Sequence, residues 1–273
     1  MTPTSPRNDD RTPQPFVAVD VGNTRTKLGL FVERAGGAKL PPPERELDFG
    51  GQERNFDAIS TWLAPYQIAD VAWRIASVNR PGSTRLIDWL REREATDSTR
   101  FVTRSDLPLT VSVARPDMVG IDRLLAGVGA NVLRAPERPA VIVDLGTAIK
   151  VDLVSPEGAF LGGAILPGIG LSARALHEFT DLLPLIKMED LSHPPAPLGT
   201  STVEAMRAGL FWGAVGAARE LIARFRALNA AEPQVFLTGG AAPNVAPLLA
   251  VDCTHVPHLV LGGLAATVRG ERG

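Results

Sequence analysis

Hydrophobic and polar residues alternate along the chain in short blocks, and this pattern is typical of an α/β protein. Strands are predicted at 16–20, 27–32, 45–49, 71–78, within 140–154 on both sides of a Gly-Thr turn, at 159–168 and at 234–240. Helical spacing predicts helices at 55–66, from Pro81 to Trp89, at 120–134, after 168 to about Phe179, from about Thr202 to Leu228 and at 258–269. The segment 184–199 is expected to be an irregular loop.

One pattern occurs twice. VAVDVGNTRTKLGL begins at Val17 and VIVDLGTAIKVDLV begins at Val141; each is a β-branched strand, an Asp, an apolar residue, a Gly turn and a second strand. Such self-similarity indicates two related α/β domains that face each other. Since 103–118 lacks periodicity and contains two prolines, it is expected to be the crossover. The predicted domains are therefore 16–118 and 119–273, after a disordered tail at 1–15.

Composition narrows the classes of partner. The formal net charge of −2 in 273 residues gives no reason to expect nucleic acid or an anionic membrane. Residues 1–15 are polar and proline-rich without an apolar signal region, and no apolar run reaches the ~18 residues of a membrane span. The single Cys253 suits a reducing compartment, and the four histidines lack metal-ligand spacing. We therefore expect a cytoplasmic protein.

The repeated turns are candidates for a phosphate site. Asp20 ends the first strand, and the Gly turn after it presents backbone N–H groups and the hydroxyl of Thr24 toward one point. A carboxylate there orients a hydrated divalent metal, although a plain hairpin is an equal alternative for one turn alone. Asp144 follows a second strand of apolar residues, where burying an ionised carboxylate without a partner would be costly. Two such acids at equivalent strand ends indicate one shared cation and phosphate site.

Taken in order, the motifs resemble those of the actin, sugar-kinase and Hsp70 superfamily, and more narrowly those of type III pantothenate kinases. The matching strings are DVGNT (20–24), GIDR (120–123), DLGTA (144–148), GGAILPG (162–168), LGTSTVEAMRAG (198–209) and the TGG turn at 238–240. The resemblance implies two ribonuclease-H-like (actin-like ATPase) domains, each a mixed sheet flanked by helices, with the active site in the cleft between them. It also implies ATP-dependent phosphorylation of pantothenate, the first step of coenzyme A biosynthesis.

The resemblance assigns roles to individual residues. Asp122 matches the general base that accepts the proton of the substrate hydroxyl. Asp20 is expected to position Mg²⁺, and Asp144 to bind the potassium or ammonium ion that the family uses. The expected ATP contacts are Asp20, Val21, Gly22, Asn23, Thr24, Arg25, Thr26, Lys27, Thr147, Gly239 and Gly240. The expected pantothenate contacts are Gly120, Ile121, Asp122, Arg123 and Thr202. Thr202 is also a possible helix N-cap, and the family resemblance implies a homodimer.

The sequence departs from the family pattern at two positions. Val113 stands where the family usually has a Tyr, so the pantothenate pocket is expected to be more apolar or to obtain that contact elsewhere. Lys150 and Asp152 follow DLGTA where the family tends to have threonines. Strand alternation places Lys150 on the same face as Asp152. Its ammonium either replaces the monovalent cation, paired with Asp144 or Asp152, or points to solvent.

Two other functions are compatible with the sequence. One is a catalytically weak accessory or regulatory relative with the same fold, and the other is a kinase of a different small alcohol. The intact Asp122 and both phosphate turns argue against the first, since a protein without catalysis has little need for all three together. The length of the chain argues against sugar kinases, which are usually longer and carry other signatures.

Overall fold

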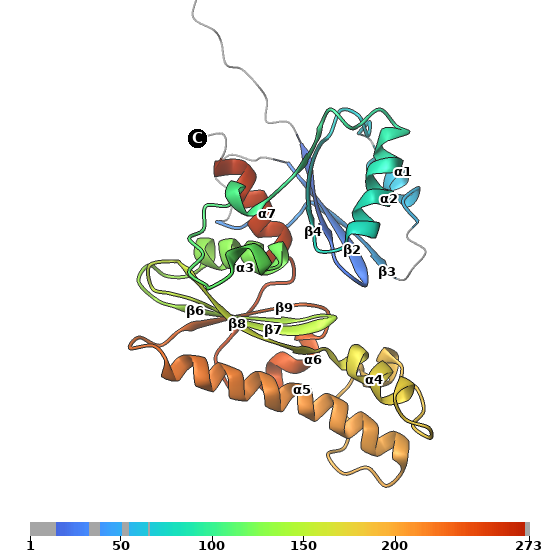
Figure 1. Ribbon diagram of the computed structural model, residues 1–273, viewed down its shortest axis with the longest axis vertical. Helices are drawn as coiled ribbons and strands as arrows, with labels where there is room; N and C mark the ends of the chain where they lie inside the picture. The colour runs from blue at the N-terminus through green and yellow to red at the C-terminus, as the bar shows by residue number, and fades with distance from the viewer. Residues whose placement is uncertain (1–14, 33–38, 51–54, 65, 271–273) are drawn as a thin grey trace, which may run out of the picture.

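The computed structural model of the protein describes residues 15–32, 39–50, 55–64 and 66–270. The tail predicted to be disordered, apart from Pro15, lies outside these described residues. Figure 1 shows the described part as two sheets with helices between and around them.

The first sheet mixes antiparallel and parallel strands. Its order is β3 (Arg45–Gly50), β2 (Arg25–Phe31), β1 (Phe16–Val21), β4 (Ala72–Ser77) and β5 (Thr99–Phe101). Strands β3, β2 and β1 pair with one another in antiparallel fashion, whereas β4 runs parallel to β1 and to β5. A hairpin followed by a parallel crossover therefore builds this sheet.

The second sheet repeats the first. Its order is β8 (Phe160–Pro167), β7 (Ala148–Val154), β6 (Ala140–Leu145), β9 (Gln234–Thr238) and β10 (Thr254–His255). Again the first three strands are antiparallel and the last two are parallel additions. Both sheets thus have the same strand order and the same strand directions, which confirms the predicted fold class.

The helices cover the sheets on both faces. They are α1 (Ala58–Trp62), α2 (Arg80–Arg91), α3 (Ile121–Leu133), α4 (Ile169–Glu178), α5 (Thr202–Ala227), α6 (Ala242–Val245) and α7 (Leu259–Gly270). Short 3₁₀ turns lie at 104–106, 116–118, 188–191 and 246–248. The side chain of Asn79 accepts from the backbone of Gly82 at the start of α2, and Ser201 caps α5 in a capping box with Glu204.

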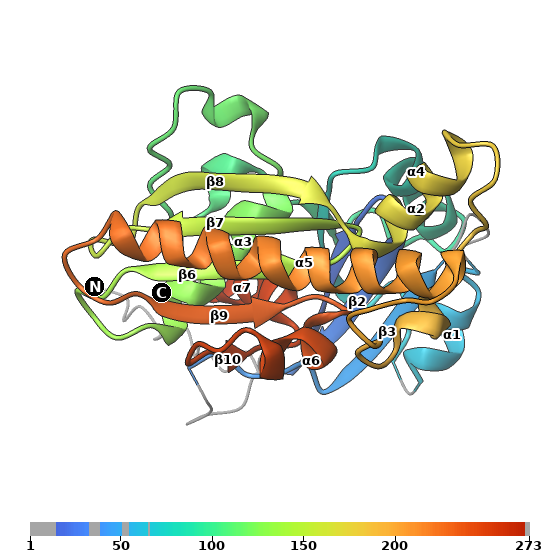
Figure 2. The ribbon, with the colours of Figure 1, turned by 90° about the horizontal axis from the view of Figure 1, so that it is seen from below.

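Helices α3 and α7 form a layer between the two sheets (Figure 1). One side of this layer packs on Phe16 and Ala18 of β1, and the other packs on Ala140 and Ile142 of β6. The two helices approach closely, because a Cβ on Gly129 would lie 2.7 Å from the carbonyl oxygen of Leu259. The outer faces are covered by α1 and α2 on the first sheet and by α5 on the second, as Figure 2 shows for α5.

Strand alternation determines where the two repeated acids point. Val17, Val19 and Val21 of β1 face the outer layer, so the intervening positions through Asp20 face the α3–α7 layer. In β6 the same alternation places Asp144 on the inner face of the second sheet, where Ile142 also lies. Both carboxylates therefore point into the layer that the two sheets share.

Some elements differ from the predictions. Strands β5 and β10 and helix α6 were not predicted, because segments of two to four residues do not show a period. The helix expected at 55–66 is confined to α1, and the crossover contains two 3₁₀ turns. The predicted domain boundary near residue 118 stays a prediction. Among the described helices none is both long and apolar enough to span a membrane.

Candidate active site

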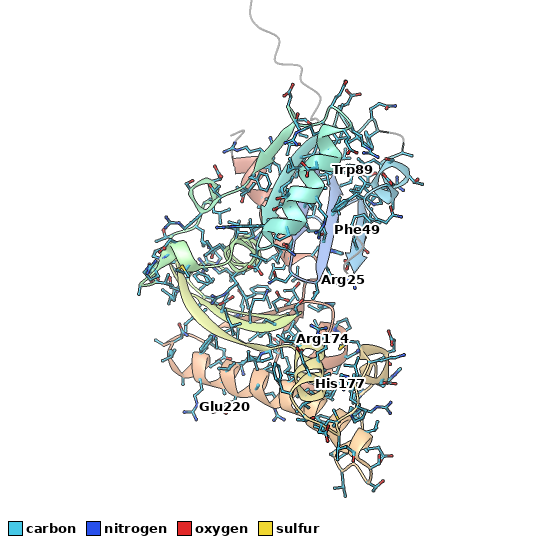
Figure 3. The ribbon with its side chains drawn as sticks, turned by 45° about the vertical axis from the view of Figure 1, so that its right-hand side comes forward. Arg25, Phe49, Trp89, Arg174, His177 and Glu220 are labelled. Atoms are coloured by element: carbon cyan, nitrogen blue, oxygen red, sulfur yellow. The ribbon has the colours of Figure 1, made fainter. Side chains whose placement is uncertain are left out.

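The two turns that follow Asp20 and Asp144 lie face to face. In the first, the backbone N–H of Gly22 donates to the carbonyl of Arg25 over 2.9 Å and closes the β1–β2 turn. The hydroxyl of Thr24 in this turn hydrogen-bonds the hydroxyl of Thr147 in the second turn. Figure 3 shows Arg25 at the end of the first sheet that is nearer to the second sheet. The structure therefore brings together two turns whose threonines are 123 positions apart in the sequence.

A residue that the sequence reasoning missed supports the first turn. Asn79, directly after β4, donates its side-chain amide to the carbonyl of Gly22 over 3.1 Å. The same side chain accepts from the N–H of Gly82 over 2.9 Å and caps α2. The available signal was an Asn two residues before Pro81, which is typical of a helix start. Asn79 thus fixes the turn to the end of the neighbouring strand.

Asp20 is an unusual carboxylate. It lies opposite Lys27 in the β1–β2 register, and its Oδ1 is buried without a hydrogen-bond partner among the described residues. Burial, and next the negative charge of Asp122, raise its pKa to about 7, although Lys27 and Lys150 act in the opposite direction. An acceptor buried without a donor is costly unless a ligand satisfies it.

Asp122 lies in the first turn of α3, which follows the N-cap residue Gly120. Its Oδ1 accepts from the backbone N–H of Arg123 over 2.9 Å, and its Oδ2 accepts from Nζ of Lys150 over 2.8 Å. The N-terminus of a helix favours a negative charge at this position. The carboxylate is therefore held in one orientation from two sides.

Gly120 makes room for that carboxylate. A Cβ on Gly120 would lie 2.5 Å from Oδ1 of Asp122, although the backbone angles of Gly120 (φ −59°, ψ 134°) suit any residue. We expect Gly120→Ala to displace the carboxylate and to lower kcat by about tenfold or more. The unfolding free energy should also fall, by about 0.5–2 kcal/mol, because Ala is a poorer N-cap residue than Gly. Steady-state rates and thermal unfolding measure the two effects.

Arg85→Ala, at an exposed position of α2, is the control and should leave kcat unchanged. An unchanged kcat in Gly120→Ala would contradict the steric role of Gly120.

Two buried ion pairs connect α3 to the second sheet. Nζ of Lys150 lies 2.7 Å from Oδ2 of Asp144 as well as 2.8 Å from Asp122. Arg123 pairs in bidentate fashion with Asp152, and its guanidinium lies 5.4 Å from the centre of the Phe160 ring. The two carboxylates raise the pKa of Lys150 despite its burial, which acts in the opposite direction. Burial raises the pKa of Asp152, and Arg123 opposes that shift.

These pairs exclude one of the two alternatives left open for Lys150. The side chain of Lys150 is only 16% exposed, so the interpretation as a lysine that points to solvent is wrong. Its partners are Asp144 and Asp122, whereas Asp152 is paired with Arg123. The guanidinium of Arg123 is therefore engaged within the protein, and its predicted contact with pantothenate stays a prediction.

The glycines of the GGAILPG and TGG motifs lie around the charged cluster that Asp122, Arg123, Asp144, Lys150 and Asp152 form. Gly239 has a φ of +94°, and a Cβ on it would lie 2.6 Å from Oδ1 of Asp144. Gly163 lies against Asp152, and Gly168 lies against the Gly146–Thr147 turn, both too closely for any side chain. The GGAILPG string therefore allows β8 and the start of α4 to pack directly on the candidate site.

Other predicted site residues lie farther from the cluster. Thr26 is fully buried opposite Val21, on the outer face of the first sheet, so the sheet separates its side chain from Asp20. Its predicted side-chain contact with phosphate is therefore not supported. The side chain of Arg25 forms an ion pair with Asp48. Thr202 begins α5 with an exposed side chain, and Ser201, not Thr202, is the N-cap.

Solved structures with a similar fold cover almost the whole chain. The ethanolamine utilization protein EutJ from Carboxydothermus hydrogenoformans matches with a TM-score of 0.52 and 10% sequence identity, over 94% of this chain and 90% of that one. A chain of the PilM–PilN type IV pilus biogenesis complex matches with a TM-score of 0.50 and 12% identity, over 93% and 98%. At such low identity these matches show the fold alone.

Sequence comparisons are more specific. The family model for type III pantothenate kinase matches residues 16–224. The type III pantothenate kinase of Rhodopirellula baltica is 40% identical over 91% of this chain and 96% of its own length. A protein of the same name from Thermus thermophilus is 36% identical over 94% of this chain and 100% of its own length. The chain therefore belongs to the type III pantothenate kinase family.

Proposed function

We propose that this chain transfers the γ-phosphoryl group of ATP to the primary hydroxyl of pantothenate, as the first step of coenzyme A biosynthesis. The observation that carries the proposal is the position of Asp122. Lys150 and the backbone N–H of Arg123 orient this carboxylate. Lys150 also pairs with Asp144, which belongs to the second of the two facing turns that are candidates for the phosphate site. An accessory protein without catalysis would not require a carboxylate fixed in this way.

The proposed chemistry is an in-line phosphoryl transfer. Asp122 accepts the proton of the pantothenate hydroxyl while the hydroxyl oxygen forms a bond to the γ-phosphorus. The bond from the γ-phosphorus to the β,γ-bridging oxygen breaks, and ADP leaves with that electron pair. Backbone N–H groups of the Asp20–Thr24 and Asp144–Thr147 turns, with Lys27, bind the phosphates and stabilise the charge that develops on them.

The residues fit a magnesium ion bound together with ATP. Oδ1 of Asp20 is a buried oxygen that lacks a donor among the described residues, and carboxylate oxygen is a preferred ligand of Mg²⁺. No group of three or more acidic, histidine or cysteine residues in the described chain forms a complete metal site. This suits a metal held by one carboxylate and by the substrate phosphates, where it neutralises phosphate charge.

The residues do not fit a potassium or ammonium ion at Asp144. Nζ of Lys150 already lies 2.7 Å from Oδ2 of this carboxylate, at the place where such an ion would bind. No step of the proposed reaction is therefore assigned to a dissociable monovalent cation.

The adenine ring of ATP would bind beside the Gly239–Gly240 turn. A cavity of about 240 Å³ lies there, and its lining is mostly apolar with two polar side chains. The lining residues are Ile169, Met188, Leu191, Ser192, Phe211, Gly240, Ala241, Asn244 and Val245. A flat apolar ring with polar edges suits such a lining.

We further propose that the enzyme is a homodimer paired through α5 and the segment before it. A Cβ on Gly209, Gly213 or Gly216 would meet nothing within 4 Å, so this face of α5 is open to close approach by a second helix. Large apolar side chains are exposed in the preceding segment, with Phe179 and Leu198 each 80% exposed. The exposed Thr202 would contribute to the pantothenate pocket at this interface.

We expect Gly213→Arg to convert the dimer into a monomer without loss of folding. A long charged side chain on the open face prevents close helix packing, and its Cβ would meet no atom of its own chain within 4 Å. Light scattering coupled to size-exclusion chromatography gives the mass. Thr84→Arg, on the exposed face of α2, is the control and should leave the mass unchanged. A wild-type protein that elutes as a monomer would contradict the proposal.

The substrate is tested directly with a panel of alcohols. The protein is incubated with ATP, Mg²⁺ and one of several alcohols, including pantothenate, a hexose and an N-acetylhexosamine, and ADP is measured. We expect ADP with pantothenate far above the level without an acceptor. ADP formed only with another alcohol would indicate a different substrate, and no ADP with any acceptor would indicate an accessory role.

A further inference from the structure

Lys150 places a buried positive charge between two carboxylates that come from different parts of the chain. Its Nζ lies 2.8 Å from Oδ2 of Asp122 on α3 and 2.7 Å from Oδ2 of Asp144 on β6. All three side chains are 19% exposed or less. Two carboxylates this close together repel each other strongly unless a cation lies between them. The arrangement therefore requires a cation, and the chain supplies one.

The backbone fixes this cation in place. Lys150 lies on β7, the central strand of the β6–β7–β8 meander, where it pairs with Asp144 on one side and Ile165 on the other. A charge attached to a strand paired on both sides remains at the site, whereas a free ion is bound only as far as its concentration and affinity allow. The positive charge beside Asp122 does not depend on the salt around the protein.

The same contact orients the proposed base. Nζ of Lys150 binds one oxygen of Asp122, and the N–H of Arg123 binds the other. Asp144, which precedes the second turn, binds the same ammonium group. A movement of that turn would therefore shift Lys150 and change the orientation of Asp122. Lys150 is thus a positioning residue that acts through Asp122.

We propose that the ammonium group of Lys150 takes the place of a dissociable monovalent cation between Asp122 and Asp144, so that this kinase works without added potassium or ammonium. The proposal rests on the proposed phosphoryl transfer for its rate measurements, but its binding measurements do not depend on the substrate.

The first test uses the wild-type protein alone. Pantothenate phosphorylation is measured in choline chloride and in potassium or ammonium chloride at equal ionic strength, so that screening is the same in each case. We expect the rates to agree within about twofold, since the site already holds its cation. Strong activation by potassium or ammonium would overturn the proposal, and this result does not depend on the folding of any variant.

The second test compares two substitutions of the same lysine. Lys150→Ala removes the charge and leaves space, whereas Lys150→Met removes the charge and fills the space. We expect both to lose about 10- to 100-fold in kcat. Potassium or ammonium should restore much of the rate of Lys150→Ala but not of Lys150→Met. Lys39→Met, which replaces an exposed lysine, is the control and should behave as wild type. Lys150→Ala with full activity in choline would overturn the proposal.

A third measurement separates this proposal from the choice of substrate. An ion that binds only the folded state raises the melting temperature. Potassium should raise the melting temperature of Lys150→Ala above the choline value, and it should not do so for wild type or Lys150→Met. This pattern would support the proposal even if pantothenate were not the acceptor. A potassium-dependent rise in wild type of the same size as in Lys150→Ala would overturn it.

Discussion

Replacing Asp122 by Asn is expected to lower kcat by about 10²-fold or more while the fold and ATP binding remain. The amide keeps the shape of the side chain, but its single oxygen can accept from only one of the two donors that bind the carboxylate, Lys150 or the N–H of Arg123. It cannot accept the proton of the pantothenate hydroxyl. The loss should therefore appear in kcat and not in the KM for ATP, and steady-state kinetics separate the two.

Asp117→Asn is the matched control for Asp122→Asn. Asp117 lies a few residues before Asp122, is exposed, and forms a surface ion pair with Arg115. Its removal should change kcat and stability little, since exposed ion pairs contribute little. Unchanged turnover in Asp122→Asn would contradict the assignment of Asp122 as the base.

Asp20→Asn should have opposite effects on stability and on catalysis. The wild-type carboxylate is desolvated and lacks a donor for Oδ1, so its replacement should raise the unfolding free energy of the ligand-free protein by about 1–3 kcal/mol at pH 8. The same replacement removes the proposed ligand of Mg²⁺, so kcat/KM for ATP should fall by about 10²-fold or more. Chemical denaturation and steady-state kinetics measure the two effects.

The gain in stability should depend on pH in a defined window. The pKa of Asp20 is raised from 3.8 to about 7 in the folded protein. As the pH rises from 4 toward 7, the unfolded state loses this proton first, so the wild-type free energy of unfolding falls relative to that of Asp20→Asn. Above about pH 7 the difference becomes constant.

Asp88→Asn, at an exposed position of α2, is the control for Asp20→Asn and should show neither the stability gain nor the loss of activity. An Asp20→Asn protein that is less stable than wild type at pH 8 would contradict the description of Asp20 as an unsatisfied carboxylate.

Most of the fold was predictable from residue pattern. The repeated block that begins at Val17 and at Val141 indicated two related domains, and the structure gives both sheets the same strand order. The short strands β5 and β10 were missed, because they have three and two residues and little apolar character. Their positions depend on pairing with β4 and β9, which a local sequence window does not contain.

The candidate site was predictable in its components but not in its connections. The strand pattern put Lys150 and Asp152 on one face, but only the position of α3 shows that Lys150 reaches Asp122 while Asp152 pairs with Arg123. Asn79 was missed because its partner Gly22 is 57 residues away in the sequence. Thr26 was grouped with its neighbours in the turn, although strand alternation turns its side chain to the opposite face.

A crystal structure with a non-hydrolysable ATP analogue, Mg²⁺ and pantothenate would show the reacting groups directly. We predict that the triphosphate lies between the Asp20–Thr24 and Asp144–Thr147 turns. The terminal hydroxyl of pantothenate should lie within about 2.6–3.2 Å of the Asp122 carboxylate and point toward the γ-phosphorus. A triphosphate bound elsewhere, or a hydroxyl held by a group other than Asp122, would contradict the assignment.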